Sequence, residues 1–266
     1  MKKFWGFLLV IVLMTSCGEY QSLLKSNDYN LVYKKAIEYY NKGDYQRAMN
    51  LLDGVRSVFV GQAKAQNIAY YRAFCSYNMK DYQIASDLFK QFIQTYPESS
   101  FAEECLYMMG FCDYKASPKP RLDQQVTEKA IREFQLYLSR YPYSMRKDKV
   151  NTYMDEMRDK LSYKAYLSAK NYYLREHYKA AVISLQNCLK DYPGSKYREE
   201  IMYMLFVSKY QMAVNSVEDK KVERYNNARE EYYYFDDEYP NSRYAADVKK
   251  MYEDIEAYLE NYKFED

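Results

Sequence analysis

The tetrapeptide Tyr-Pro-x-Ser occurs four times in this chain: YPES at Tyr96–Ser99, YPYS at Tyr141–Ser144, YPGS at Tyr192–Ser195 and YPNS at Tyr239–Ser242. These copies use four of the six prolines in the 266-residue chain. Proline disfavours helical geometry at the residue before it and cannot continue a helix. The serine that follows can accept a hydrogen bond at the start of the next helix. The tetrapeptide therefore predicts, at four places, a helix end followed closely by a helix start.

An alanine stands twelve residues before each of these prolines, and large side chains follow it at helical spacing. Ala130, for example, is followed by Phe134 and Tyr137, four and seven residues later. Positions i, i+4 and i+7 share one face of a helix. Each tetrapeptide is therefore expected to close an amphipathic helix. The corresponding alanines are Ala85, Ala130, Ala181 and Ala228.

A second helix is expected ahead of each of these helices. Ala73 and Ala169 lie twelve residues before Ala85 and Ala181, and each has a tyrosine four residues later. This alternation of small and aromatic residues ahead of a proline resembles the tetratricopeptide repeat, a pair of antiparallel helices. The resemblance implies an all-α fold, a right-handed solenoid of five tetratricopeptide-like helix pairs, in which neighbouring pairs share one continuous core.

Departures from the repeat divide the chain. Phe59 and Val60 replace Tyr-Pro in the first repeat, and inserts lengthen the third repeat at Ser117–Val126 and the fifth at Asn215–Lys221. A long region without glycine or proline predicts a lengthened helix around Lys147–Leu174. We expect repeats one to three over residues 29–144, and the long connecting helix with repeats four and five over residues 145–266.

The first residues have the form of a bacterial lipoprotein signal. Lys2 and Lys3 precede an apolar stretch, Phe4–Leu13, that is too short for the roughly 20 residues of a membrane-spanning helix. The following LMTSCG, at Leu13–Gly18, resembles a lipobox. The resemblance implies a signal peptide over residues 1–16, fatty acyl chains such as palmitate on Cys17, and a lipidated linker over residues 17–28. A plain secretory signal, leaving Cys17 as a free thiol, is the alternative.

Charge and composition bear on the class of function. The chain has 39 basic and 37 acidic residues, and the two numbers become equal once Lys2 and Lys3 are removed with the signal. No nucleic-acid partner is expected, because such proteins show a basic excess. His177 is the single histidine and the chain has seven glycines, which argues against a multi-histidine zinc site and a glycine-rich phosphate loop. We therefore expect no catalytic residues, no metal and no cofactor.

Four further cysteines follow Cys17. None of them forms a Cys-x-x-Cys pair, and all lie among apolar residues at helical spacing. They are expected to be buried thiols, and a disulfide in an oxidising compartment is the alternative. These residues are Cys75, Cys105, Cys112 and Cys188.

Longer segments of the chain resemble the BamD family of outer membrane assembly lipoproteins, in particular its Bacteroidetes-type members. The segments are SPKPRLDQ at Ser117–Gln124, AIREFQLYLSRYP at Ala130–Pro142, SAKNYYLREHYKAAV at Ser168–Val182, AVNSVEDKKVERY at Ala213–Tyr225 and YPNSRY at Tyr239–Tyr244. The resemblance implies a lipid-anchored protein on the periplasmic side of the outer membrane. Its partners would be the BamA-type barrel subunit and segments of unfolded outer membrane proteins. A tetratricopeptide lipoprotein adaptor for peptidoglycan, secretion or gliding machinery is the alternative.

The same resemblance implies a peptide groove lined by the first helix of each pair. Tyrosine rings there would stack on aromatic side chains of a barrel precursor, and asparagines would bind its backbone. The alternative is that these rings are packing and these asparagines are ordinary surface residues. The candidates are Asn30, Tyr33, Asn67, Tyr70, Phe74, Asn78, Tyr107 and Phe111.

Basic residues of the C-terminal half are candidates for pairing with the soluble domains of the barrel subunit. These candidates include Arg224, Arg229 and Arg243. Solvated surface charge is the alternative interpretation for each of them.

Overall fold

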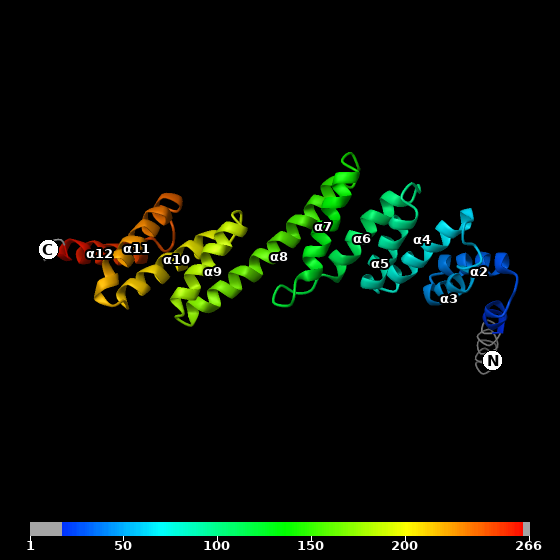
Figure 1. Cartoon of the computed structure of the whole chain (residues 1–266), viewed down its shortest axis with the longest axis horizontal. Helices are drawn as coiled ribbons and strands as arrows, with labels where there is room; N and C mark the ends of the chain where they lie inside the picture. The colour runs from blue at the N-terminus through cyan, green and yellow to red at the C-terminus, as the bar shows by residue number, and fades with distance from the viewer. Residues whose placement is uncertain (1–17, 263–266) are drawn as a thin grey trace, which may run out of the picture. The chain divides into compact units, whose positions relative to one another are not determined.

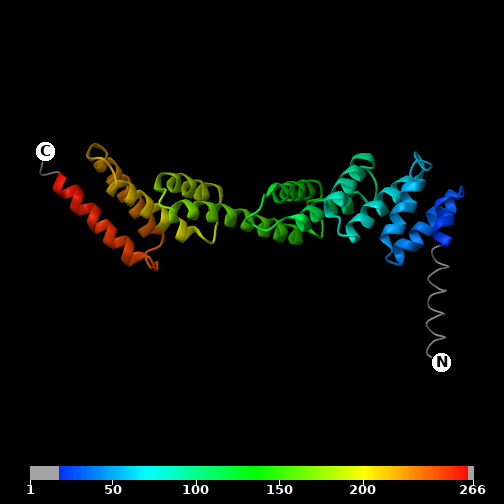
Figure 2. The same cartoon turned by 90° about the horizontal axis from the view of Figure 1, so that it is seen from below.

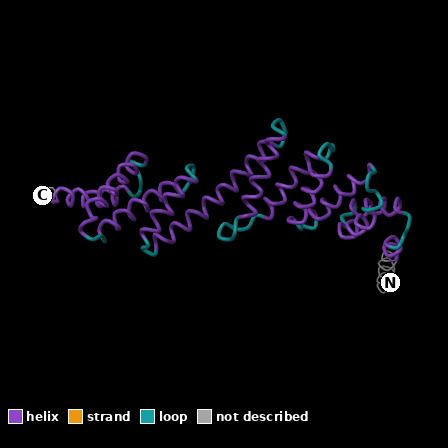
Figure 3. The backbone as a smooth tube through the Cα atoms, in the orientation of Figure 1, coloured by secondary structure: helices purple, strands orange, loops and turns teal. Residues whose placement is uncertain are grey.

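The computed structural model describes residues 18–262, and every regular element in that range is a helix (Figure 3). The all-α prediction is thus confirmed for these residues. The expected signal peptide and Cys17 lie outside the described residues. Within residues 18–262, no helix is both long enough and apolar enough to cross a bilayer.

Residues 18–24 are helical, and a succession of longer helices follows them (Figure 1). Their bounds are α2 (Tyr29–Asn41), α3 (Tyr45–Val55), α4 (Ala63–Asn78), α5 (Tyr82–Thr95), α6 (Ala102–Ala116), α7 (Gln125–Arg140), α8 (Lys147–Leu174), α9 (Tyr178–Asp191), α10 (Arg198–Val214), α11 (Glu218–Glu238) and α12 (Ala245–Tyr262). The five expected pairs are α2 with α3, α4 with α5, α6 with α7, α8 with α9, and α10 with α11. Helix α12 follows the fifth pair.

The described residues form two compact units, one up to Met157 and one from Arg158 onward, and the boundary in the sequence falls within α8. The sequence placed the division earlier, between residues 144 and 145. The first part of α8 belongs to the first unit because Val150 and Met154 are buried in the core of α6 and α7. The remainder of α8 belongs to the second unit, where Tyr166 packs in a core with α9 and α10. The long helix itself has the expected bounds, Lys147–Leu174.

Consecutive helices of each unit pack side by side (Figures 1 and 2). The stripes that the sequence predicted form their contacts: Ala130, Phe134 and Tyr137 of α7 are all fully buried. Gly110 of α6 shows how close two helices come, because a Cβ atom at this position would lie 2.9 Å from Cδ1 of Phe134. A side chain at Gly110 would therefore force α6 and α7 apart.

Helix α12 has one apolar side and one charged side. Val248, Ile255 and Leu259 are buried, and the helix contacts both α10 and α11. Lys250 and Glu253 lie on the opposite face and are exposed. Beyond the fifth pair, the second unit therefore presents a helix whose outward face is polar.

The four tetrapeptides share one backbone conformation. In each, the tyrosine N–H still donates to the carbonyl four residues back, as Tyr141 does to Tyr137 at 2.8 Å, and the next helix starts within a few residues. The serine N–H then donates to the tyrosine carbonyl, as from Ser144 to Tyr141 at 3.2 Å. The tetrapeptide thus ends one helix and begins the next, as predicted.

The serine of each tetrapeptide also accepts a bond from the N–H two residues later, and its hydroxyl reaches a neighbouring repeat in three of the four copies. Ser144 accepts from Arg146 at 3.2 Å and donates to Glu103 Oε1 at 2.7 Å. Ser242 similarly donates to Glu199 Oε1 at 2.7 Å. Glu103 and Glu199 lie in the first turns of α6 and α10, so this serine links the loop to the first helix of the preceding pair.

The turns inside three helix pairs share a left-handed residue. Gly43, Lys80 and Glu176 have φ of 81°, 67° and 58°. The next residue then donates its N–H to a carbonyl five positions back, as Asp81 does to Ser76 at 3.0 Å. Glycine adopts this conformation without strain, whereas lysine and glutamate do not. The pattern of bonds nevertheless holds at all three turns.

A buried polar cluster joins α5, α6 and α7. Lys129 Nζ lies 2.8 Å from Asp113 Oδ2 and 3.7 Å from Glu133 Oε1, and Ser86 Oγ donates to Asp113 at 3.0 Å. Glu133 Oε2 is buried and has no hydrogen-bond partner among the described residues. Burial, together with the adjacent Asp113, raises the pKa of the Glu133 carboxyl to about 8.

The four described cysteines are buried and free. Of the two possibilities that the sequence left open, the structure therefore has the buried thiols. Burial raises the pKa of Cys75 and Cys105 to about 12 and that of Cys188 to about 11. Such thiols carry almost no thiolate at neutral pH and are unreactive.

We expect Ser144→Ala to lower the free energy of unfolding of the first unit by about 1–2 kcal/mol, because it removes the bond from Arg146 and the bonds with Glu103 and the Tyr137 hydroxyl. Ser99→Ala is the matched control, since Ser99 Oγ accepts only from Phe101, and it should cost less. Urea unfolding followed by circular dichroism measures both. Equal losses of unfolding free energy would mean that the bonds of Ser144 with Glu103 and Tyr137 add no stability.

The second prediction concerns pH and Glu133. Between about pH 5 and pH 8 the folded protein keeps a proton on Glu133 that the unfolded chain releases, so raising the pH through this range destabilises the fold. Glu133→Gln has no such proton to lose. Its free energy of unfolding, relative to that of the unmodified protein, should therefore rise by about 1–3 kcal/mol between about pH 5 and pH 8.

Urea midpoints of both proteins, measured at several pH values across this range, test the prediction. Glu128→Gln is the control, because Glu128 forms only an exposed ion pair with Arg132. A difference between Glu133→Gln and the unmodified protein that stays constant with pH would rule out the proposed titration.

Candidate protein-binding surfaces

The eight groove candidates lie on the first helices of the first three pairs, all within the first unit. Two are on α2, four on α4 and two on α6. On α4 the candidates are spaced so that they share one helical face. In the same order the sets are Asn30 and Tyr33; Asn67, Tyr70, Phe74 and Asn78; Tyr107 and Phe111.

Tyr70 and Phe74 form the centre of an aromatic row on α4. The Tyr70 ring lies 4.5 Å from that of Phe74 and 4.6 Å from that of Phe101, between ring centroids. The Tyr70 hydroxyl donates to Glu104 Oε2 at 3.0 Å. Burial, and then this bond, raises the pKa of Tyr70. Both rings are half-buried, so each contributes to packing and also presents an edge to solvent.

The two candidates on α6 differ in how far their rings are exposed to solvent. Tyr107 is only 7% exposed, and the guanidinium carbon of Arg146 lies 4.7 Å from the centroid of its ring. Phe111 is half-buried and stacks on Tyr107 at 5.6 Å and on Tyr114 at 5.9 Å. Phe111 extends the aromatic row through Tyr77 of α4, whose ring lies 6.3 Å from that of Phe74 and 6.2 Å from that of Phe111. Tyr107 is buried behind Phe111.

The three asparagine candidates have different partners. Asn78 Nδ2 donates to the carbonyl of Phe74 at 2.7 Å, and Asn30 Oδ1 accepts from Lys64 Nζ at 2.5 Å. Asn67 is half-buried and has no side-chain hydrogen bond to other residues of the described range. Of these amides, that of Asn67 is the one with both its donor and its acceptor available.

Tyr33, the remaining candidate, lies apart from the row on α4. Its ring is 6.1 Å from that of Phe59, and Lys64 Nζ lies 5.7 Å from its centroid. The structure thus brings together the candidates of α4 and α6 and leaves those of α2 beside the loop after α3.

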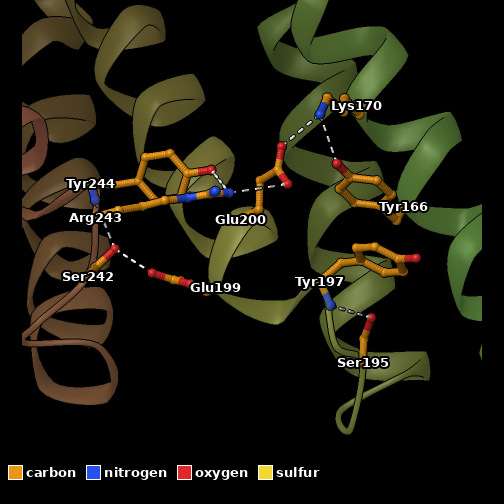
Figure 4. A network of polar contacts seen from close by, with 9 residues as sticks. All are labelled: Tyr166, Lys170, Ser195, Tyr197, Glu199, Glu200, Ser242, Arg243 and Tyr244. Carbon is orange, nitrogen blue, oxygen red and sulfur yellow. Dashed lines mark hydrogen bonds and ion pairs between the residues drawn. The ribbon is translucent and has the colours of Figure 1, made fainter.

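A polar network in the second unit joins α8, α10 and the loop before α12 (Figure 4). Lys170 Nζ donates to Glu200 Oε1 at 2.7 Å and to the Tyr166 hydroxyl at 2.8 Å. The bond with Glu200 is the main reason that the pKa of Lys170 is raised. Arg243 donates to the Tyr244 hydroxyl at 2.6 Å and lies 3.9 Å from Glu200 Oε2. The residues of this network bond to one another, so we interpret the network as a connection between repeats.

The three arginines that the sequence indicated as candidates differ in whether a carboxylate lies near the guanidinium group. Arg243 and Arg229 each have a carboxylate nearby, Glu200 at 3.9 Å and Glu256 at 3.5 Å. Arg224 instead donates to a hydroxyl and a carbonyl, Ser216 Oγ at 2.6 Å and the Met212 oxygen at 3.4 Å, and it has no ion pair among the described residues. These neutral acceptors orient its guanidinium without neutralising it.

Arg224 borders a cavity of about 600 Å³ between the start of α9 and the end of α10. Met212 and Ile183 supply apolar lining, and Ile183 is 55% exposed. Lys179 adds a second cation and Glu176 an acid. The sequence identified Arg224 but missed this cavity, because the apolar residues that form it have the same helical spacing as core residues.

No group of three or more metal-ligating side chains occurs within the described range. His177 precedes the first residue of α9 and borders the same cavity as Arg224. These surfaces are therefore characterised by rings, amides and guanidinium groups, which suit the binding of a polypeptide.

One family covers most of this sequence. The match is to YfiO, described as an outer membrane lipoprotein, over residues 25–200 and again over 164–265. The chain belongs to this family. YfiO is the BamD family, so the resemblance that the inserts indicated is confirmed. The family match covers both units and all five helix pairs.

Solved structures that match this YfiO family member have low sequence identity to it. The TPR2AB domain of yeast Sti1, in its pHSP90 complex, is 14% identical over 86% of this chain and 98% of that chain, with a TM-score of 0.39. A TPR repeats protein of Bacteroides fragilis NCTC 9343 is 13% identical over 87% and 99%, with a TM-score of 0.42. The human IFIT1 dimer with PPP-AAAA is 17% identical over 94% and 63%, with a TM-score of 0.30. No curated protein matches the chain.

The half-buried state of Tyr70 leads to a prediction. Tyr70→Ala should lower the free energy of unfolding by about 2 kcal/mol, because the ring packs on Phe74 and Phe101. Tyr70→Phe keeps the ring and should cost less than about 1 kcal/mol. Tyr143→Ala is the control, since Tyr143 is 98% exposed. Thermal and urea unfolding measure all three; a Tyr70→Ala variant as stable as Tyr143→Ala would mean that the ring is a free surface.

Proposed function

We propose that this protein is an outer-membrane-anchored periplasmic scaffold of the β-barrel assembly machinery. It binds the BamA-type barrel subunit and helps to receive unfolded outer membrane proteins for insertion. The observation that carries the proposal is the match to one family of outer membrane lipoproteins over residues 25–265, across both units. Stacked helix pairs offer extended surfaces that suit such a role.

The anchor in this proposal is Cys17. Acylation of its sulfur and its new amino group would hold the protein at the membrane, because two or more acyl chains give stable anchoring at about 0.8 kcal/mol for each buried methylene. Tyr20 and Leu23, three and six residues after it, are buried in the core of the first unit. The first unit is therefore tethered close to the lipid surface.

The aromatic row on α4 and α6 is the proposed contact for barrel precursors. A barrel strand alternates apolar and polar side chains and carries aromatic residues near its ends. The exposed edges of Tyr70, Phe74 and Phe111 would contact such aromatic side chains, and the unbonded amide of Asn67 would bind the strand backbone. The remaining candidates do not form this contact surface. Tyr107 is buried, Asn78 bonds to the Phe74 carbonyl, and Asn30 and Tyr33 of α2 lie apart from the row.

Arg224 is the proposed contact for the barrel subunit. An oriented guanidinium without a carboxylate of its own gains most from a carboxylate on a partner. Arg229 and Arg243 have less to gain, since Glu256 and Glu200 already lie near them. The apolar lining beside Arg224 adds area that a partner side chain can bury.

Purification of the full-length lipidated protein from membranes in mild detergent tests the proposal. We expect a BamA-type barrel subunit to be recovered with it, and Arg224→Gln to lower that recovery about fivefold or more, as removal of a buried charge pair does. Arg229→Gln is the matched control and should leave recovery unchanged. Circular dichroism establishes that both variants are folded.

One outcome would contradict the proposal as a whole, and another would contradict only the role of Arg224. Recovery of a different envelope machine, for peptidoglycan, secretion or gliding, in place of a barrel subunit would favour the adaptor alternative. Recovery of the barrel subunit with equal loss in both arginine variants would keep the scaffold function and remove the specific role of Arg224.

A further inference from the structure

The first repeat differs from the others at the loop that closes it. Phe59 and Val60 stand where the later repeats have Tyr-Pro. Phe59 is buried at 4% exposure, and Val60 is 74% exposed. The connection between α3 and α4 therefore keeps one apolar side chain in the core and presents the next one to solvent.

Val60 borders a cavity of about 430 Å³ that the proposed function does not use. The floor is formed by Ala65 and Ala69 of α4, whose small side chains leave the space open. Leu88 and Gln91 of α5 form one side. The volume is within the range of pockets that bind peptide side chains and other small groups.

The cavity lies on the opposite side of α4 from the aromatic row. Ala65, Ala69 and Arg72 are at positions i, i+4 and i+7 of that helix and share one face. Tyr70 and Phe74 are displaced from this face by about half a helical turn. A ligand in the cavity therefore contacts none of the rings of the aromatic row on α4.

Two guanidinium groups set the charge of the cavity. Arg72 is 9% exposed, and its Nε lies 2.6 Å from Asp53 Oδ1. Arg56 is exposed at the rim and has no ion pair within residues 18–262. With one carboxylate for two guanidiniums, the cavity has an excess positive charge.

The polar lining favours a polypeptide. The Gln91 side chain has no hydrogen bond to another residue of the described range, so its amide can both donate to and accept from a peptide group. Val60 and Leu88 offer apolar surface beside it. An extended segment with an apolar side chain next to a carboxylate would use all three features, namely the amide, the apolar surface and the Arg56 guanidinium.

We propose that this cavity is a docking site for an extended segment of a partner protein in which an aliphatic or aromatic side chain adjoins a carboxylate. The apolar side chain lies over Ala69 between Val60 and Leu88, and the carboxylate pairs with Arg56. The inference is independent of the proposed function, since it holds for whichever envelope machine the protein serves.

The test uses end-blocked octapeptides with a fluorescent label, whose central pair combines Phe, Leu or Ser with Glu, Gln or Lys. Fluorescence anisotropy with the full mature chain measures their affinity. A photo-crosslinking residue at Gln91 locates the contact, and the same residue at Asn67, on the other face of α4, is the positional control. We expect peptides that pair Phe or Leu with Glu to bind best and to crosslink at Gln91.

Val60→Ser and Arg56→Gln should each weaken this binding about fivefold or more, as truncation of a central interface side chain does. Both side chains are exposed, so neither change should affect folding. The matched controls are Val217→Ser and Arg121→Gln, an exposed valine of the second unit and an exposed arginine of the α6–α7 loop. They should leave affinity unchanged.

Several results would overturn the proposal. These are absence of binding by every peptide at millimolar concentration, equal affinity for Glu and Lys peptides, and crosslinking at Asn67 but not at Gln91. Vesicles of phosphatidylglycerol and of phosphatidylcholine are the final comparison. Arg56-dependent binding to the anionic vesicles, without peptide binding, would assign the cavity to lipid headgroups instead.

Discussion

Each helix pair in this protein has an apolar stripe that only a neighbouring pair can cover, and the fold depends on that constraint. Within the third pair, Gly110 of α6 permits close approach to Phe134 of α7. The next pair completes the burial, because Tyr153 of α8 stacks on Phe134 at 5.9 Å and Val150 lies in the same core. The Tyr-Pro-x-Ser loop fixes where one helix stops and the next starts, which keeps successive stripes in register. A substitution that loosens the packing of one pair therefore destabilises mainly the pairs on either side of it.

The abundance of tyrosine follows from the same constraint. A tyrosine ring fills space between helices, and its hydroxyl can reach a charged group on the next pair. Tyr70 of α4 bonds to Glu104 of α6 in this way, and Tyr114 of α6 bonds to Glu156 of α8. In the second unit Tyr166 bonds to Lys170 and stacks on Tyr197 at 4.4 Å. The tyrosines thus add directional bonds to interfaces that leucine would fill by packing alone.

Much of the fold could be predicted from sequence because its signals are local. The alanine spacing and the tetrapeptide are each contained within about fifteen residues, and a run without glycine or proline was enough to place the ends of α8. The division into units could not be placed in the same way. It depends on which residues of α8 pack on α7 and which pack on α9, and a periodic sequence does not distinguish them.

The candidate sites were less predictable, for the same physical reason. Tyr70 and Tyr107 occupy equivalent positions in successive repeats, yet Arg146, almost forty residues further along, covers only the ring of Tyr107. Arg224 and Arg229 are also alike in sequence, and they differ because Glu256 of α12 lies beside only one of them. The burial of a ring and the presence of a charge partner are determined by residues that are distant in sequence. The spacing of residues within a repeat therefore cannot predict them.

Helix α12 has a consequence for the behaviour of the protein at high concentration. A stack of similar units is inherently open-ended, because any bare apolar stripe at its end can recruit a pair from another molecule and begin a filament. Lys250 and Glu253 face outward from α12 where such a stripe would otherwise be. A second molecule that stacked on this helix would bury those charges without partners, which costs free energy. The outward face of α12 therefore disfavours polymerisation through this helix.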